Sequence, residues 1–261
     1  MRLGAICLAL AGCSAASPAG PPWATYAAQA DEAGLWIASE TALLVVPGNL
    51  TPRPTPEWTA RDAANVAWVP FSPNDCVVAH VSGATVTYAL DGCTGSFGLV
   101  HVSGHLAVTY GAGSERTELD ATSADLVLNG GALSFTAHAS VAYDSAMGMR
   151  TIEVSVDTQG AGPSGTAFTR HGTQRARWFD SWGCLFVDRG DDVITAGELA
   201  WRQITTGLTY CVGECPMSGG TITWMGEPGS LRVGYGGTRE VTWSVEDVPA
   251  AAGSLSISCG I

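Results

Sequence analysis

Two similar segments decide the fold of this chain: Val81-Ser82-Gly83-Ala84-Thr85-Val86-Thr87-Tyr88 and Val102-Ser103-Gly104-His105-Leu106-Ala107-Val108-Thr109-Tyr110. In each segment, a Ser-Gly pair precedes a run in which apolar and polar residues alternate. Alternation with a period of two places the apolar side chains on one face of a β-strand. The two copies begin 21 residues apart, a spacing that suits successive strands of an antiparallel meander.

The same pattern extends through the rest of the chain. A further copy occurs at Met217–Trp224 and a looser one at Gly237–Trp243, and from about Cys76 onward there is no convincing helix apart from a short turn. We therefore predict a mainly all-β domain over residues 70–261, made of twisted antiparallel sheets in a meander or sandwich-like arrangement. Its other expected strands include Asp125–Leu128, Leu133–Tyr143, Thr151–Thr158 and Leu231–Tyr235.

Residues 24–69 are predicted to form a short helical segment that packs on the β domain. The Ala-rich stretch Ala24–Val45 follows one proline and ends before another, as helices commonly do. Glu57–Ala67 is a second expected helix, with Thr55 as its N-cap and Pro56 at its first position. In the first helix the apolar positions follow a helical repeat, with acidic residues off that line: Tyr26, Ala30, Ala33, Ile37 and Leu44 against Asp31, Glu32 and Glu40.

The first residues have the pattern of a secretory signal. Met1-Arg2 supplies a charged start, and Leu3–Leu10 supplies an apolar run too short to cross a bilayer. Leu10-Ala11-Gly12-Cys13 resembles the lipobox of bacterial lipoproteins. The resemblance implies that residues 1–12 are removed and that Cys13 carries the lipid, with residues 13–23 as a tether. Ser14 after the cysteine implies the outer membrane, by analogy with enteric bacteria.

A wider resemblance covers roughly residues 70–261. The runs Ser72-Pro73-Asn74-Asp75-Cys76, Cys211-Val212-Gly213-Glu214-Cys215 and Ser254-Leu255-Ser256-Ile257-Ser258-Cys259 look like those of uncharacterised β-rich lipoproteins from GC-rich Gram-negative bacteria. The use of 12 Arg and no Lys fits a GC-rich genome. This resemblance implies an architecture and a location in the cell envelope, and it implies no activity.

Six cysteines remain after Cys7 and Cys13, and an even number in an oxidising compartment predicts up to three disulfides. Cys76 and Cys93 bracket one expected hairpin and are the preferred pair. For the other four, Cys211 and Cys215 either pair with each other or reach out to Cys184 and Cys259. A zinc site formed by these four is the alternative.

The net charge of -12 leaves no basic patch for a row of phosphates, so we expect no nucleic-acid partner. The chain has no nucleophile elbow, no zinc-protease motif, no phosphate-binding loop and no dinucleotide fingerprint. The lack of Lys excludes Schiff-base and Ser–Lys mechanisms. A Ser-His-Asp triad stays open because it is assembled in space. We predict a protein that is not an enzyme and that needs no cofactor.

Two polar stretches have a structural and a functional interpretation. His101 and His105 are about 13 Å apart on a strand, too far to share a metal ion, and we assign them to solvent or packing. Asp188–Asp192, followed by Glu198, does not match the ligand spacing of an EF-hand. We interpret it as a solvated acidic turn between strands, with an irregular calcium site as the alternative.

The aromatic residues divide into two groups. Strand alternation assigns Tyr88, Tyr110, Trp224 and Trp243 to the core. The segment 175–182 mixes aromatic and charged groups, and its candidate ligand platform consists of Arg175, Arg177, Trp178 and Trp182. An edge strand protected by charge is the alternative.

These features favour a non-catalytic, lipid-anchored protein of the cell envelope, with a structural or interaction role. Its expected partners are the membrane, through the lipid on Cys13, and a glycan or another envelope protein. The alternative is a glycan- or peptidoglycan-binding surface module, and a further alternative is an unrecognised hydrolase.

Overall fold

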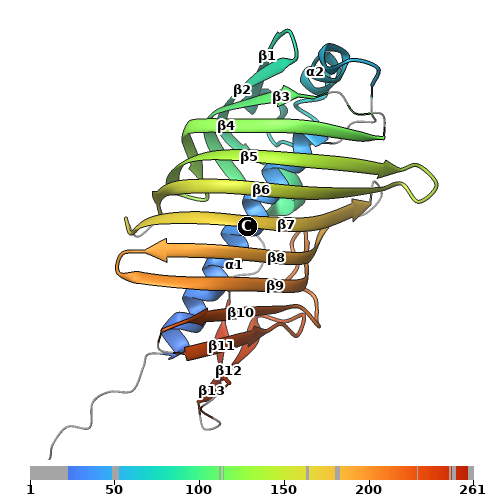
Figure 1. Ribbon diagram of the computed structural model, residues 1–261. Helices are drawn as coiled ribbons and strands as arrows, with labels where there is room; N and C mark the ends of the chain where they lie inside the picture. Colours follow the sequence, from blue (N-terminus) through green and yellow to red (C-terminus); the bar gives the residue numbers. More distant parts are fainter. Residues whose placement is uncertain are drawn as a thin grey trace, which may run out of the picture.

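In the part of the chain that the structure describes, thirteen strands form one antiparallel sheet in which every strand pairs with its neighbours in the sequence (Figure 1). The computed structural model describes residues 23–48 (the backbone alone for 45–48), 53–111, 113, 115–162, 165–179, 183–227, 229–246, 248 and 251–257. The predicted meander is therefore confirmed. The sandwich-like alternative is not what the described residues form, because their strands belong to a single open sheet.

The strands run in chain order along the sheet. They are β1 Val77–Ser82, β2 Thr85–Thr94, β3 His101–Tyr110, β4 Arg116–Leu128, β5 Gly131–Asp144, β6 Met149–Ala161, β7 Ala167–Phe179, β8 Cys184–Ala196, β9 Leu199–Cys211, β10 Thr221–Gly226, β11 Gly229–Gly234, β12 Glu240–Val245 and β13 Ala252–Ser256. Two short 3-10 helices, η1 (Asn74–Cys76) and η2 (Ser96–Gly98), flank β1 and β2.

The two Ser-Gly pairs of the repeated segments have different roles. Gly83 has a φ of 60° and lies in the tight turn between β1 and β2, where glycine meets no steric penalty. Gly104 lies inside β3, next to an irregularity in the pairing of β3 with β4. A Cβ atom on Gly104 would be 2.4 Å from the carbonyl oxygen of Asp125, so only glycine fits there.

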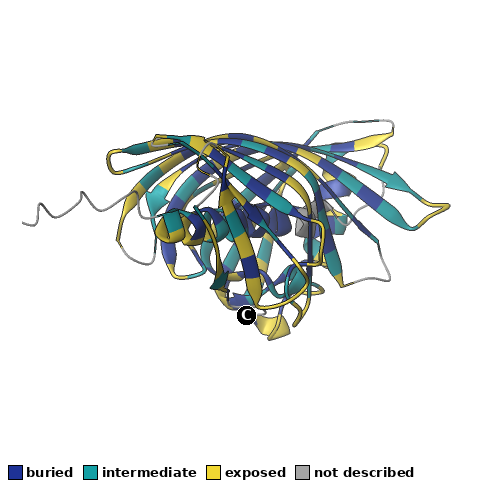
Figure 2. Ribbon diagram, turned by 90° about the horizontal axis from the view of Figure 1, so that it is seen from below, coloured by how far each residue is buried: buried dark blue, intermediate teal, exposed yellow. Residues whose placement is uncertain are grey.

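Helix α1 (Trp23–Gly48) crosses the concave face of the sheet, and the strands curve around it (Figures 1 and 2). Its 26 residues span about 39 Å, enough to cross about eight strands. It contacts β10–β13 near its start and β4, β6 and η2 further along. The expectation that the helical segment packs on the β domain is confirmed. Gly34 allows the closest approach, since a Cβ there would be 2.4 Å from Cδ1 of Ile222.

Residues 37–44 of α1 are enclosed on every side. All residues from Ile37 to Leu44 are buried, including Ser39, Glu40 and Thr41. Ser39 donates a hydrogen bond to the carbonyl oxygen of Leu99 at 2.8 Å, on the chain between η2 and β3. Glu40 is off the line of the apolar repeat, as the sequence indicates, and it is nevertheless buried, because a helix inside a curved sheet has no solvent-facing side at this point.

Several bulges contribute to the curvature of the sheet. The register shifts between β2 and β3, between β3 and β4, between β4 and β5, and between β7 and β8. Each bulge adds an unpaired residue to one strand, which bends the strand and increases its twist. The last of these shifts separates the pairs Arg175–Arg189 and Ala176–Val187, so Asp188 is the extra residue.

Helix α2 (Pro56–Asn65) packs on β1, β2 and β3. Its predicted start is confirmed, because the Thr55 side chain accepts a hydrogen bond from the backbone N–H of Trp58 and Pro56 occupies the first turn. Such a cap satisfies one of the N–H groups that a helix leaves unpaired at its start.

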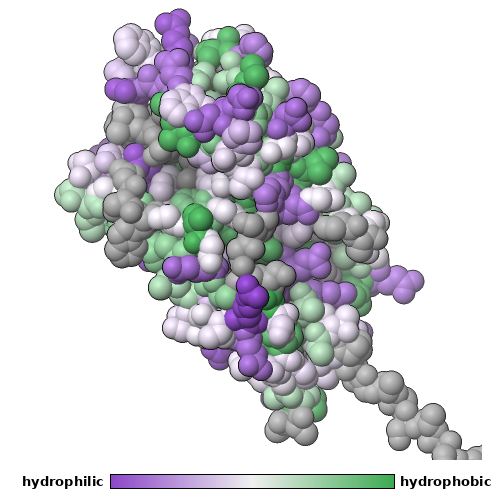
Figure 3. All heavy atoms as spheres, turned by 180° about the vertical axis from the view of Figure 1, so that it is seen from behind, coloured by the Kyte–Doolittle hydropathy of each residue, from purple (hydrophilic) through white to green (hydrophobic). Residues whose placement is uncertain are grey.

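The inner face of the sheet and α1 share one core. Tyr88, Tyr110 and Trp224 are buried and Trp243 is partly buried in it, as predicted. Tyr26 of α1 packs edge-on against Trp224, with ring centroids 4.6 Å apart. On the side of the molecule opposite to Figure 1, hydrophobic residues occur in small groups between hydrophilic ones (Figure 3).

Candidate functional site

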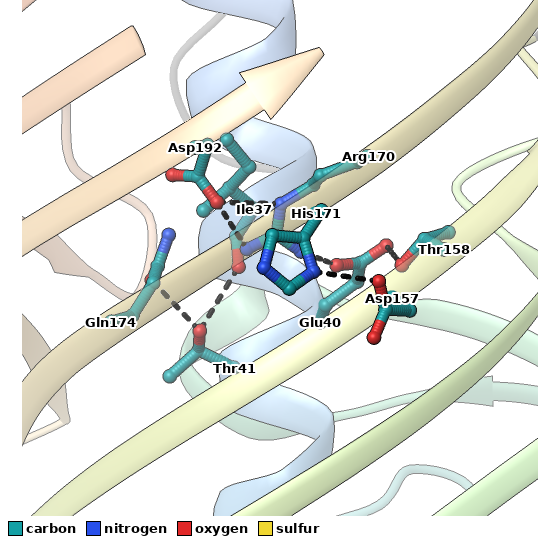
Figure 4. Close-up of polar contacts among 9 residues, drawn as sticks. All are labelled: Ile37, Glu40, Thr41, Asp157, Thr158, Arg170, His171, Gln174 and Asp192. Atoms are coloured by element: carbon teal, nitrogen blue, oxygen red, sulfur yellow. Dashed lines mark hydrogen bonds and ion pairs between the residues drawn. The ribbon is translucent and has the colours of Figure 1, made fainter. Parts of the chain in front are cut away.

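A cluster of buried charges joins α1 to the inner face of the sheet. Arg170 of β7 lies between two carboxylates, Glu40 of α1 and Asp192 of β8 (Figure 4). Arg170 Nε and Nη2 lie 2.8 and 2.7 Å from Asp192 Oδ1, and Nη1 donates to Glu40 Oε2. The hydroxyl of Thr158 on β6 donates to the other oxygen of Glu40 at 3.0 Å. Four elements therefore meet at one ionic group.

The backbone leaves room for this cluster at two glycines. A Cβ on Gly172 of β7 would be 1.9 Å from Asp192 Oδ1, and one on Gly190 of β8 would be 3.4 Å from Asp192 Oδ2. Both glycines face inward beside the carboxylate, on strands that pair directly. The absence of side chains at these positions makes the space that the buried carboxylate occupies.

Further polar groups lie around the ionic group. The Thr41 hydroxyl is 3.1 Å from the carbonyl oxygen of Ile37 and 2.9 Å from Gln174 Oε1 (Figure 4). The side-chain amide of Gln203 and the hydroxyl of Thr205, both buried on β9, have no hydrogen-bond partner among the described residues. Buried polar groups of this kind are uncommon, and they often mark a place where a small polar molecule is held.

Burial governs the protonation of the cluster. Desolvation raises the pKa of Asp192, although its ion pair with Arg170 acts in the opposite direction. Desolvation also lowers the pKa of Arg170, while Asp192 partly restores it. Both shifts have the sign expected when a charged form is removed from water. The ion pair between Arg170 and Asp192 therefore stabilises the charged forms of both groups in an environment that would otherwise favour their neutral forms.

A second polar contact ties the start of α1 to β11 and the chain that follows it. Tyr235 Oη donates a hydrogen bond to Asp31 Oδ1 at 2.7 Å. Burial raises the pKa of the Asp31 carboxyl, and the Tyr235 hydrogen bond opposes the shift. The pKa values of Tyr235 and Tyr210 are also raised, first of all by their burial.

A pocket of about 150 Å³ lies beside the charge cluster, between α1 and the inner face of β7–β9. Glu40 and Arg170 contribute to its lining, and most of its surface is apolar. It is lined by Gln29, Glu32, Ala33, Trp36, Ile37, Glu40, Gly162, Thr166, Phe168, Arg170, Ile194, Ala196 and Trp201. No local pattern in the sequence indicates this pocket, because its walls come from segments far apart in the chain.

The structure does not bring the proposed ligand platform together. Trp178 is 5% exposed and faces the core, whereas Arg175 and Arg177 lie on the opposite, outer face of β7. Arg177 forms a two-pronged ion pair with Asp188 at 2.6 and 2.7 Å. Trp182 lies outside the described residues. Because neighbouring residues of a strand point to opposite faces, Trp178 and the two arginines form no common surface.

In two disulfides, both cysteines are described residues. Cys76 and Cys93 are bonded across the first hairpin, which confirms the preferred pair. Cys184 and Cys211 are bonded directly across β8 and β9, so the zinc alternative is wrong for these two residues. Cys215 is also disulfide-bonded. Cys259 lies outside the described residues.

The acidic segment is not the turn that the sequence suggested. Asp188–Asp192 lies inside β8, while the turn to β9 follows at Gly197. Asp188 and Asp191 pair with arginines of the adjacent strands, and Asp192 is fully buried. The bulge at Asp188 explains why Asp192 faces inward. The extra residue shifts the alternation of β8 by one position, so different residues face the core on the two sides of the bulge.

The histidines lie on the outer face, mostly in pairs with aspartates of neighbouring strands. Nδ1 of His105 lies 2.7 Å from Asp125, and Nδ1 of His171 lies 2.7 Å from Asp157. His138 pairs in the same way with Asp120. Within the ranges that the structure describes, no three His, Cys, Asp or Glu side chains form a group that could hold a metal ion.

The lipobox, including Cys13, lies outside the described residues. Neither described helix has both the length and the apolar character needed to cross a membrane. No protein-family model, curated protein or solved structure matches the chain.

The sequence contains a partial signal for the buried cluster. Arg170 and Asp192 each lie two residues from an apolar residue on the same strand, Phe168 and Ile194 respectively. This phase places Arg170 on the inner face, but for Asp192 the alternation that starts from Leu185 gives the opposite face. Their partner Glu40 is 130 residues away from Arg170 in the sequence, so no local pattern links the two.

Proposed function

We propose that the protein is a non-catalytic, lipid-anchored component of the bacterial cell envelope, with a structural or interaction role. The observation that carries this proposal is the lipobox Leu10-Ala11-Gly12-Cys13 after a short apolar run. The bonded cysteine pairs Cys76–Cys93 and Cys184–Cys211 support export to an oxidising compartment. A diacylglyceryl group with a further acyl chain would anchor the protein stably, since each buried methylene contributes about 0.8 kcal/mol.

The start of α1 orients the fold relative to this anchor. Trp23 is ten positions after Cys13, so the two Cα atoms are at most about 35 Å apart. The Trp23 ring lies against Gly229 on β11, and Tyr26 lies against Trp224 on β10. The proposal therefore places β10 and β11 closer to the membrane than the opposite end of the sheet, which carries β1 and α2 (Figure 1).

Replacement of the lipidated residue tests the proposal. We expect Cys13→Ala to move the protein from the membrane fraction to the soluble periplasmic fraction, because the anchor has no other covalent attachment point. The matched control is Cys7→Ala, which changes a cysteine of the same leader and should leave the protein in the membrane fraction. If wild type and Cys13→Ala partition alike, the lipid anchor is wrong.

A glycan-binding role through the segment 175–182 has less support than the sequence suggested. That role needs Trp178 on the surface beside Arg175 and Arg177, and Trp178 instead packs in the core. We therefore place any recognition by this protein elsewhere in the fold.

A further inference from the structure

The pocket between α1 and the sheet has the size of a small organic group. One face of the helix forms one wall, with Trp36 and Glu40 one turn apart. The inner face of β7–β9 forms the other wall, where Phe168 and Arg170 are followed on the next strands by Ile194 and Trp201. Its volume is about 150 Å³, and an apolar cavity of that size binds benzene. A trimethylammonium group has similar dimensions.

Three aromatic rings contribute to the walls. Trp36 and Phe168 meet edge to face, with centroids 5.6 Å apart and an interplanar angle of 80°. Trp201 adds a third ring from β9. The faces of aromatic rings carry negative partial charge, and sets of such rings hold quaternary ammonium ions.

The charges of the pocket favour a cation. Glu32 lies exposed on the helix side of the pocket, and Glu40 is buried in its lining. Of the described lining residues, Arg170 alone has a permanent positive charge, and Glu40 and Asp192 already pair with it. A bound anion would meet these carboxylates without a free cation to compensate, whereas an ammonium ion would be attracted by them.

Trp201 contributes its ring carbons to the pocket. Its side chain is on the inner face of β9, and the residue is 8% exposed. The indole nitrogen is itself buried, so the carbon atoms of the ring line the pocket.

From these observations we propose that the pocket lined by Trp36, Phe168, Trp201, Glu32 and Glu40 binds a small alkyl-substituted or quaternary ammonium ion. The rings contact the alkylated cation, and the carboxylates supply the opposite charge. This site does not depend on the lipid anchor, and it is separate from the segment 175–182.

Choline and its uncharged isostere, 3,3-dimethylbutan-1-ol, form the matched pair of probes. Both are titrated by calorimetry into the full chain, purified in a maltoside detergent that has no choline headgroup. We expect choline to bind about tenfold more tightly, because the two molecules differ only in the charge that the rings and carboxylates recognise. Indole ¹H–¹⁵N spectra should show a shift of the Trp201 resonance, identified with Trp201→Phe.

A third probe distinguishes the two sources from which such a cation can come, a free small molecule and a lipid headgroup. Glycerophosphocholine carries the same ammonium group with the phosphate of a lipid headgroup. We expect it to bind more weakly than choline, because its phosphate approaches Glu32. Tighter binding of glycerophosphocholine would keep the ammonium site and assign a headgroup as its source.

Two variants test the residues that recognise the cation. Trp36→Leu should weaken choline binding by about tenfold and change binding of the neutral alcohol little, because it removes a ring and keeps an apolar wall. Its control is Trp58→Leu, at a Trp that is 61% exposed on α2. Glu32→Gln should weaken choline binding severalfold at low salt and less at high salt, with Glu214→Gln, exposed after β9, as its control.

Equal affinity for choline and the neutral alcohol would overturn the proposal, since the pocket would then recognise shape without charge. Failure of both probes to bind would also overturn it. The Glu32→Gln result remains informative if Trp36→Leu fails to fold, because Glu32 is exposed and the change keeps its shape.

Discussion

Replacement of Arg170 by Met is the most direct test of how α1 is held in the sheet. The change keeps an apolar stem in the same space and removes the charge between Glu40 and Asp192, which are 3% and 0% exposed. Two buried carboxylates would then remain without a cation. Removal of one partner from a buried ion pair costs about 3–5 kcal/mol. We expect a loss of this size in the free energy of unfolding at neutral pH.

Urea unfolding measures this loss, provided that the slope of the transition is the same for both proteins. Arg202→Met is the matched control, because Arg202 forms its ion pair with Asp191 on the exposed face of the same sheet. Exposed pairs contribute far less than buried ones, so this variant should stay close to wild type. The triple variant Glu40→Gln, Arg170→Met, Asp192→Asn removes the unpaired charges and should recover most of the loss.

The pH dependence gives the same reasoning a second test. Without Arg170, desolvation raises the pKa of Asp192 in the folded state, with no ion pair to oppose it. A group with a raised pKa in the folded state contributes stability at low pH and loses it as the pH rises through that pKa. The deficit of Arg170→Met should therefore be full at neutral pH and much smaller at about pH 4. A deficit below about 1 kcal/mol at neutral pH, or one that does not change with pH, would refute a charge cluster enclosed between helix and sheet.

Three further predictions concern other parts of the fold. Asp31→Asn should raise the melting temperature at neutral pH and not at about pH 3, because burial raises the pKa of Asp31 and its ionised form costs stability as the pH rises; a gain that is equal at both pH values would contradict this. Removal of the Cys184–Cys211 disulfide by double replacement with Ser should cost about 3–4 kcal/mol, or about 10 °C in melting temperature, given the sequence separation of 27 residues; unchanged melting curves would show that the bond adds no stability. Gly172→Ala should cost about 1–3 kcal/mol in urea unfolding, because its Cβ would collide with the carboxylate of the buried ion pair, while Gly236→Ala, in open space, is the control and should have little effect.

Much of the local structure of this protein could be predicted from its sequence. Period-two alternation predicted the strands and their meander, and the Thr55-Pro56 pair predicted the start of α2, because each of these signals acts between residues close in the chain. The same holds for the Cys76–Cys93 bond, whose two residues are 17 apart and lie at the ends of one hairpin. These interactions form in the same way whatever the rest of the fold does.

The inward or outward position of several charged residues was not predictable in this way. In β8, Leu185 and Val187 face inward, and the bulge at Asp188 then shifts the pattern by one residue so that Asp192 also faces inward. If the alternation is followed from the start of β8, it places Asp192 on the outer face, and if it is followed from the end of β8, it places Asp192 on the inner face. The register of the neighbouring strand decides between them.

By itself, then, the sequence determined the antiparallel β class, several of the strands and the two helices, since hydrophobic periodicity and capping are local properties. Only the tertiary structure decided that one curved sheet encloses α1, that Glu40 meets Arg170 and Asp192 inside it, and that a pocket remains beside them. The physical reason is the distance along the chain. Glu40 contacts residues 118 and 130 positions away, and the burial that sets its energy exists only after the sheet has curved around the helix.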